Sequence, residues 1–379
     1  MGSSNAPDHV EDQGLDVVTT VADSGPSPET NNVPVRPTVQ EHVPMANRLS
    51  LESWGTGSMP GVPDVDEESN SYGRYDVEEI QSTKFSTSSI QSSIYHYVEE
   101  NGRTYHRYKQ GREQKEQDRL DLQHALFVMS TRGKIYLAPL KDDIKNILDI
   151  ATGTGLWAIE MAQLFPNAKV LGTDLSPIQP LYVPENCSFE IDDAEDEWTF
   201  STKFDYIHGR ALLSCFKDPS AVIQQAYEAL APGGYLELQD GIFPMEYAGG
   251  PRPDCALHKW NELVIAGAEK TGRSWTNVQH YKRWLEEAGF EDVVERRLYY
   301  PTSPWPKGKY YKTIAAYFQE DLLIGLDALS LKVMGALGMS PDEIREFLVD
   351  VRKDLHDTSI HGYLRIVCVY GRKPGARAA

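Results

Sequence analysis

A glycine-rich segment between an apolar strand and a helix is the feature that most constrains how this chain can fold. The residues Ile147-Leu-Asp-Ile-Ala-Thr-Gly-Thr-Gly-Leu-Trp157 begin as a short apolar strand, turn at Gly153 and Gly155, and continue into a predicted helix over 156–165. Glycine lets a backbone pass close to a ligand with no Cβ in the way. The helix N-terminus offers unpaired N–H groups with a partial positive charge. The segment therefore predicts a ligand site at the carboxyl end of a strand.

Strands and helices alternate around this segment. Strands are predicted at 146–151, 168–174, 187–192, 204–208 and 234–239, and helices at 156–165 and 220–230. Such alternation favours a doubly wound α/β fold, in which helices cover both faces of a mostly parallel sheet.

The last third of the chain does not follow this strand–helix alternation. Helices are predicted at 255–271 and 278–288, a strand at 292–299, a helical stretch at 309–356 and a final strand at 363–371. The last two strands should pair as neighbours, so residues 301–360 are predicted to form a helical insertion over one end of the sheet. Ser340-Pro341-Asp342-Glu343 predicts the start of its second helix. We expect this insertion, with Trp305 and Tyr310, to cover an acceptor pocket; packing on the sheet flank is the alternative.

The N-terminal part has a different composition. Residues 1–75 are rich in Pro, Ser, Asn, Asp and Glu without periodicity, which predicts a disordered acidic tail. The rest, 76–379, is predicted to be one domain with N-terminal helices over 90–135, a cofactor-binding core over 140–300, the insertion over 301–360 and a last strand over 361–373. The tail is either a solvated segment or a regulatory one.

Charge and cysteine content exclude several classes of function. The formal net charge is −19, of which −10 falls on residues 1–70 and −9 on the remainder. Because such a chain repels a phosphate backbone, nucleic acid is not expected as a partner. The four cysteines form no C-x-x-C pair, which predicts free thiols in a reducing compartment and no metal site.

Targeting signals are also lacking in the sequence. The N-terminus has neither a basic start nor an apolar core, and no apolar run reaches the ~18 residues that a membrane span needs. We therefore expect a cytoplasmic protein without membrane contact. A nuclear location stays open, although no clear Lys/Arg cluster supports it.

Three acidic residues lie at the ends of predicted strands and narrow the choice of ligand. Gly153-x-Gly155-x-x-Ala158, with Asp174 nineteen residues past Gly155, also fits a dinucleotide site. Asp149, however, lies inside the end of the first strand, where its carboxylate would repel a pyrophosphate and attract a cation. Asp193 ends the third strand. The set favours a ligand with positive groups over a dinucleotide.

The ordered set of motifs resembles the class I S-adenosylmethionine-dependent methyltransferases, which have a seven-stranded Rossmann-like sheet. More narrowly, the chain is similar to the fungal LaeA-like methyltransferase group over about residues 90–373. The motifs that carry this likeness are Tyr95–Tyr108, Gln117–His124, Asp193–Trp198, His208–Arg210, Cys215–Asp218 and His361–Tyr363.

The resemblance implies that S-adenosyl-L-methionine is the cofactor and that its parts meet particular residues. Asp149 would lie near the amino end of the methionine, and Asp174 would hold the ribose. The other residues implied in cofactor binding are Ala151, Gly153, Gly155, Leu175, Asp193, Ala194, Tyr105 and Arg210. Ala151 replaces a glycine usual in the class, which is tolerable if its φ is negative.

Methyl transfer from a sulfonium needs alignment and exclusion of water more than a strong catalyst. His208, at the end of the fourth strand, is the candidate general base, and a supporting role beside the loop backbone is its alternative. Arg210 would hold an acidic group or pair with a loop carboxylate. A small-molecule acceptor in fungal secondary metabolism is the main functional hypothesis. The alternatives are a LaeA-like nuclear regulator acting through protein partners or protein methylation, and a dehydrogenase on the same fold.

Overall fold

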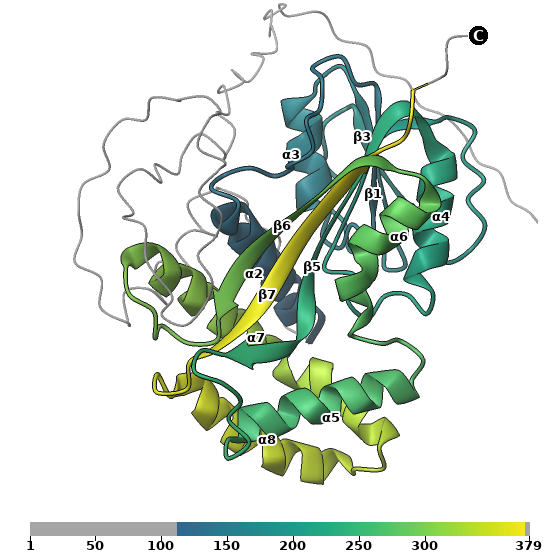
Figure 1. Ribbon diagram of the computed structural model, residues 1–379. Coiled ribbons are helices and arrows are strands. Elements are labelled where there is room, and N and C mark those ends of the chain that lie inside the picture. Colours follow the sequence, from purple (N-terminus) through teal and green to yellow (C-terminus); the bar gives the residue numbers. More distant parts are fainter. Residues whose placement is uncertain (1–111, 376–379) are drawn as a thin grey trace, which may run out of the picture. The chain divides into compact units, whose positions relative to one another are not determined.

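The computed structural model describes residues 112–375, with side chains from Lys115 onward. Within this range seven strands form one sheet in the order β3-β2-β1-β4-β5-β7-β6 (Figure 1). β7 is antiparallel to β5 and β6, and the other pairs are parallel. This confirms the predicted mostly parallel, doubly wound fold. The strands are β1 (Asn146–Ile150), β2 (Lys169–Asp174), β3 (Cys187–Ile191), β4 (Phe204–Arg210), β5 (Leu230–Tyr247), β6 (Glu291–Pro301) and β7 (Gly362–Arg372).

Helices cover both faces of the sheet because apolar residues alternate along β1. Leu148 and Ile150 pack on the side of α4 (Pro219–Ala229) and α6 (Tyr281–Ala288). Ile147 packs on the opposite side, together with α3 (Leu156–Leu164). Figure 1 shows α3 and the α4–α6 pair on opposite sides of the strands. Side chains two residues apart share a face, so Asp149 lies on the α3 side with Ile147.

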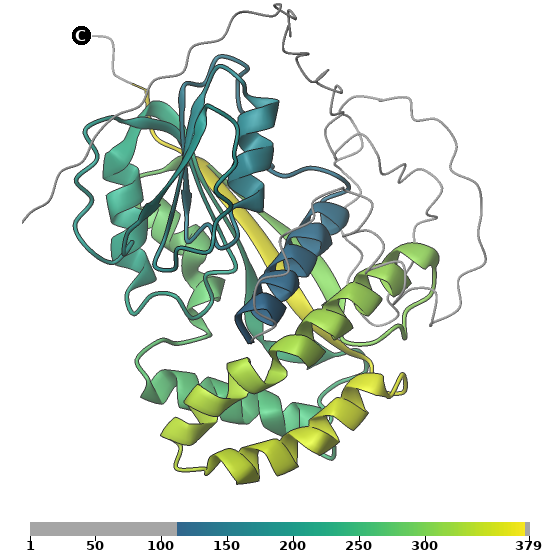
Figure 2. The same ribbon diagram turned by 180° about the vertical axis from the view of Figure 1, so that it is seen from behind.

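A third apolar core joins helices from distant parts of the sequence. It contains buried side chains from α2 (Arg112–Ser130), α5 (Ala256–Lys270), α7 (Lys309–Ala336) and α8 (Pro341–His356). In the sequence, α7 and α8 lie between β6 and β7, which pair with each other in the sheet. This confirms the predicted helical insertion. The Ser340 hydroxyl and the Glu343 carboxylate form the expected capping box at the start of α8. α2 and α7 lie side by side (Figure 2).

One strand is considerably longer in the structure than the sequence predicted. β5 was expected over 234–239 and spans Leu230–Tyr247, because β7 pairs with it in antiparallel register from Tyr235 to Tyr247. The other boundaries within the described range shift by only a few residues. The predicted tail, the part of the predicted N-terminal helices that precedes residue 112, and Tyr105 lie outside the described residues.

Trp305 and Tyr310, which were expected to help cover an acceptor pocket, make contacts within the protein. The Trp305 ring stacks on His361 at 4.7 Å between centroids, and its indole N–H donates to the Gly362 carbonyl at 2.9 Å. The Tyr310 hydroxyl, which is buried, donates to the Ser130 carbonyl at 2.9 Å. These contacts fix the start of the insertion to β7 and to the end of α2. A role of the insertion in acceptor choice stays a prediction.

Two buried carboxylates on opposite faces of β5 accept hydrogen bonds from neighbouring segments. Glu237 accepts hydrogen bonds from the backbone N–H groups of Leu137 and Ala138 and from the Tyr206 hydroxyl. Asp240 accepts from the Gly241 N–H at 2.8 Å and from the Tyr281 hydroxyl at 3.1 Å. Burial raises the pKa of Asp240 to about 7, although its hydrogen bonds favour the charged form.

The backbone at Ala151 corrects a sequence expectation. Its φ is +51°, so the residue is left-handed rather than in the negative-φ region assumed for an alanine at this position. The Thr152 N–H donates to the Thr173 carbonyl at 2.9 Å, which ties the turn after β1 to β2. A non-glycine residue in this conformation costs about 1–2 kcal/mol. Ala211, directly after β4, has a φ of +57°, so backbone strain lies at two neighbouring strand ends.

Asp240 predicts a pH dependence of stability. Because its pKa is raised in the folded state, the folded protein keeps a proton that the unfolded chain releases between about pH 4 and pH 7. Stability from this group therefore falls as pH rises through that window, by up to roughly 4 kcal/mol. We expect Asp240→Asn to gain stability relative to the wild type between pH 5 and pH 8 in urea unfolding. Asp143→Asn, at an exposed carboxylate, is the matched control, and parallel curves for Asp240→Asn and the wild type would contradict the account.

Ala151→Gly tests the strain after β1. Removing the Cβ relieves the left-handed conformation, so we expect the free energy of unfolding to rise by about 0.5–1 kcal/mol. The control is Ala158→Gly within α3, where glycine should cost about 1 kcal/mol. Chemical denaturation of both variants gives the comparison. If Ala151→Gly lost as much stability as the control, the conclusion that the backbone at Ala151 is strained would be wrong.

Candidate cofactor site at the carboxyl ends of β1 to β4

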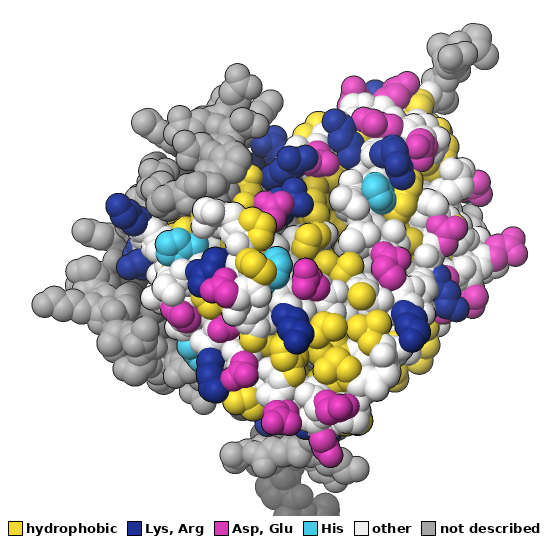
Figure 3. Space-filling view, turned by 60° about the horizontal axis from the view of Figure 1, so that its bottom comes forward, with side chains coloured by type: hydrophobic (Ala, Val, Ile, Leu, Met, Phe, Trp, Pro, Cys, Tyr) yellow, Lys and Arg dark blue, Asp and Glu magenta, His cyan; other side chains and the backbone are white. Residues whose placement is uncertain are grey.

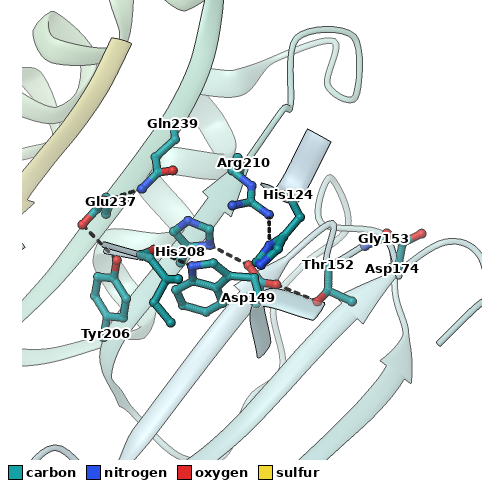
Figure 4. A network of polar contacts seen from close by, with 12 residues as sticks. His124, Asp149, Thr152, Gly153, Asp174, Tyr206, His208, Arg210, Glu237 and Gln239 are labelled. Carbon is teal, nitrogen blue, oxygen red and sulfur yellow. Dashed lines mark hydrogen bonds and ion pairs between the residues drawn. The ribbon is translucent and has the colours of Figure 1, made fainter. Parts of the chain in front are cut away.

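The predicted site residues gather at one edge of the sheet. β1, β2, β3 and β4 are parallel, so their carboxyl ends lie together. Asp149 and Asp174 lie at the ends of β1 and β2, Asp193 follows β3, and Arg210 ends β4. Figure 4 shows the polar network that surrounds Asp149 and Arg210. The fold therefore brings together carboxylates from three strands and a guanidinium from a fourth.

Strand register explains the contact between Asp149 and His208. The two residues are partners in the β1–β4 ladder, so their side chains lie next to each other on the α3 face. The His208 Nδ1 lies 2.7 Å from the Asp149 Oδ1, and the Thr152 hydroxyl donates to the Asp149 Oδ2 at 2.6 Å. The Trp157 ring of α3 stacks on His208 at 3.8 Å with an interplanar angle of 5°. Asp149 is 3% exposed and His208 only 1%.

Asp174 holds the glycine-rich turn. Its carboxylate accepts the Gly153 N–H at 2.8 Å and the Ser176 N–H at 2.9 Å. Gly153 and Gly155 have φ values of +60° and +78°, which glycine adopts without strain. A Cβ on Gly155 would also lie 2.4 Å from the Phe189 ring on β3. Gly155 is thus required by packing within the protein as well as by the turn.

The ends of β2 and β3 combine carboxylates with exposed apolar side chains. Asp193 accepts the Glu195 N–H at 2.9 Å, and Ala194 is largely buried. Leu175 and Ile191 are each 67% exposed, which is unusual for large apolar residues beside a core. Ile191 is the ladder partner of Asp174, so both side chains lie on the same face. Ile191 was absent from the sequence prediction, and its position as the last apolar residue of β3 is the signal that could have indicated it.

Arg210 is held by α2. Its Nη2 donates to the His124 Nδ1 at 2.8 Å, and the guanidinium lies 4.9 Å from the centre of the Phe127 ring. The other ring nitrogen of His124 lies 3.2 Å from the Glu160 carboxylate. Burial lowers the pKa of Arg210, and the nearby Asp149 charge opposes this shift most strongly. The half-buried side chain thus lies within the influence of the Asp149 carboxylate.

α2 also contacts the glycine-rich turn and α7. The Thr154 hydroxyl donates to Asp121 of α2 at 2.8 Å. Arg119 of α2 bonds Asp321 of α7 at 2.8 Å. Burial alone would lower the pKa of Arg119, but its acidic partners outweigh this effect and raise it. Sequence reasoning assigned no role to His124, Asp121 or Trp157, although all three lie in the motifs that it singled out.

The chemistry of this edge suits a ligand with cationic groups. The loop amides of Thr152, Gly153 and Gly155 already donate within the protein, whereas a pyrophosphate would need such amides. Carboxylates at the ends of β1, β2 and β3 match an ammonium or sulfonium, ribose hydroxyls and an adenine amino group. These residues fit S-adenosylmethionine better than a dinucleotide.

Comparisons with known proteins identify the family of the chain. A family profile described as "Methyltransferase domain" matches residues 120–295. The chain is 34% identical over 300 residues to methyltransferase pytC of Aspergillus terreus, covering 77% of this chain and 93% of pytC. It is 30% identical over 293 residues to the probable methyltransferase tdiE of Emericella nidulans, covering 76% and 92%. It is 31% identical over 300 residues to the secondary metabolism regulator laeA of Aspergillus fumigatus, covering 76% and 80%.

The predicted family is therefore confirmed by relatives that are 30–34% identical and are matched over 80–93% of their own length. The sheet order, the carboxylates at the strand ends and these relatives lead to the same conclusion. The chain belongs to the class I S-adenosylmethionine-dependent methyltransferases, in the fungal group that includes pytC and LaeA.

Proposed function

We propose that this methyltransferase transfers the methyl group of S-adenosylmethionine to a small-molecule acceptor of fungal secondary metabolism. The observation that carries the donor site is the set of Asp149, Asp174 and Asp193 at three neighbouring strand ends, with Arg210 at the fourth. The pytC and tdiE relatives are named as methyltransferases, and laeA as a regulator of secondary metabolism, which supports this setting for the acceptor.

For this reaction the protein mainly has to align the methyl donor with the acceptor. The bound donor supplies a methyl group on a sulfonium, whose carbon–sulfur bond breaks as the bond to an acceptor oxygen or nitrogen forms. S-adenosylhomocysteine leaves, and the acceptor proton passes to solvent or to a nearby base. We infer that Asp174 holds the ribose, that Asp193, Ala194 and Leu175 meet the adenine, and that the acidic edge favours the cationic donor.

The same donor site would serve a regulatory protein that methylates protein partners. The likeness to laeA is nearly as high as that to pytC, which keeps this second function open. Under it the protein would act in the nucleus, and the acidic residues 1–75 would contribute to partner binding. Under the first function a cytoplasmic location suffices.

Nucleic acid and membranes are not part of the proposal. On the face seen in Figure 3, basic and acidic side chains are interspersed among hydrophobic ones and form no basic stripe. A phosphate backbone would find no concentrated positive charge on that face. Among the described residues, no helix is both long and apolar enough to cross a bilayer.

Transfer of a labelled methyl group distinguishes a small-molecule acceptor from a protein acceptor. The full chain is incubated with methyl-labelled S-adenosylmethionine and a fungal lysate that is then separated into metabolite and protein fractions. We expect label in the metabolite fraction, with none above background for heat-inactivated protein. Label confined to the protein fraction would contradict the small-molecule proposal and support the regulatory one.

A substitution of Asp174 tests its proposed contact with the ribose of the donor. A ligand that binds only the folded state raises the melting temperature, so S-adenosylhomocysteine should do so for the wild type. Asp174→Asn keeps one acceptor oxygen for the Gly153 or Ser176 amide but loses the charge. We expect the binding free energy to weaken by about 1–3 kcal/mol. Asp143→Asn is again the control, and an unchanged affinity for Asp174→Asn would exclude the ribose contact.

A further inference from the structure

We propose that two buried histidines act as positioning residues for a pair of opposite charges that grips the amino-acid end of the methyl donor. His208 orients Asp149 toward the ammonium, and His124 orients Arg210 toward the carboxylate. This inference rests on the proposed donor site and adds to it the residues that recognise one end of the donor.

The first pair is built by strand register. Asp149 is an acceptor when ionised, so the His208 Nδ1 must carry the proton that bridges the 2.7 Å between them. Trp157 fixes the imidazole plane by stacking, and its own indole N–H donates to the Ile135 carbonyl at 2.7 Å. The hydrogen bond from His208 therefore holds the Asp149 carboxylate in one orientation. It accepts two described bonds out of roughly four lone-pair sites, which leaves capacity for an ammonium.

The second pair is built by α2. Because Arg210 can only donate, the His124 Nδ1 must present its lone pair and carry its proton on the other nitrogen, beside Glu160. The Phe127 ring lies against the guanidinium on the same helix. One guanidinium N–H group is thus committed to His124, out of about five that an arginine offers. Arg210 is a suitable partner for the planar carboxylate of an amino acid.

Strand register places the two charges on one face of the sheet. Asp149 pairs with His208 in the β1–β4 ladder, and Arg210 lies two residues after His208 on β4. In agreement with this placement, Asp149 is the strongest of the charges that raise the pKa of the half-buried Arg210. A neighbouring negative and positive group match the ammonium and carboxylate of an amino acid, which is a zwitterion. Figure 4 shows Asp149 and Arg210 on adjacent strands, each with its histidine beside it.

The same geometry favours a positioning role for His208 over the predicted role as general base. A general base must come within about 2.6–3.2 Å of the proton that it takes. The His208 ring is 1% exposed, its Nδ1 is bonded to Asp149 and its face is covered by Trp157. Within the described part of the chain its Nε2 is buried and has no hydrogen-bond partner. A positioning role accounts for these contacts directly, and the general-base role stays a prediction.

The test compares ligands that differ only in the amino-acid end. Isothermal titration calorimetry is run on the full chain with S-adenosylhomocysteine, its decarboxylated form and 5′-methylthioadenosine, which lacks both the ammonium and the carboxylate. His208→Phe keeps a ring against Trp157 but loses the N–H donor. We expect it to bind the first two ligands about tenfold more weakly, as for one lost bond to a charged group, and 5′-methylthioadenosine as the wild type does.

His124→Leu should give a different pattern. Losing its acceptor frees the Arg210 guanidinium to turn, so affinity for S-adenosylhomocysteine should fall by about tenfold. The decarboxylated ligand and 5′-methylthioadenosine should be unaffected. The conservative variants His208→Asn and His124→Asn keep a donor or an acceptor near the Nδ1 position, and we expect them to restore most of the selectivity.

Parallel losses for all three ligands would overturn the positioning roles, because they would indicate a general distortion of the site. If His208→Phe or His124→Leu does not fold, as judged by circular dichroism, Asp149→Asn and Arg210→Met carry the same two patterns. Failure of the wild type to bind S-adenosylhomocysteine at all would instead overturn the donor site itself, and this proposal with it.

Discussion

The hydrogen bond between His208 and Asp149 is the interaction on which the rest of the site depends. It exists because β1 and β4 pair in a register that places the two side chains on one face. Trp157 covers it, so α3 must begin directly after the glycine-rich turn. A buried carboxylate is stable only when its partners are in place, which makes this bond a constraint on the turn, the helix and the strand order together.

The same principle extends along the sheet. Glu237 lies in register with His208 on the next strand and holds the segment around Leu137 through backbone bonds. α2 then covers the strand ends and carries His124 to Arg210. A row of buried polar groups thus holds these segments against the sheet, and the charges of the proposed site lie together at one edge. Structure and proposed donor recognition follow from the same contacts.

Local signals in the sequence predicted most of the fold. The glycine-rich turn, the strand–helix alternation and the capping box at Ser340 depend on neighbouring residues and were found as expected. The length of β5 was missed because its partner β7 lies more than a hundred residues away. The negative φ that was set as the condition for an alanine at 151 is not met, since the turn is tied to β2 by the bond between Thr152 and Thr173, which the residue type does not reveal. Likewise, no local pattern could pair His124 with Arg210 across 86 residues.

The most direct measurement of the central claim is calorimetric titration of the purified full chain with S-adenosylhomocysteine and, in parallel, with NADH. The strand-end carboxylates and the internally bonded loop amides predict one-to-one binding of S-adenosylhomocysteine and no heat of binding for NADH. Binding of NADH without binding of S-adenosylhomocysteine would contradict the assignment of this site.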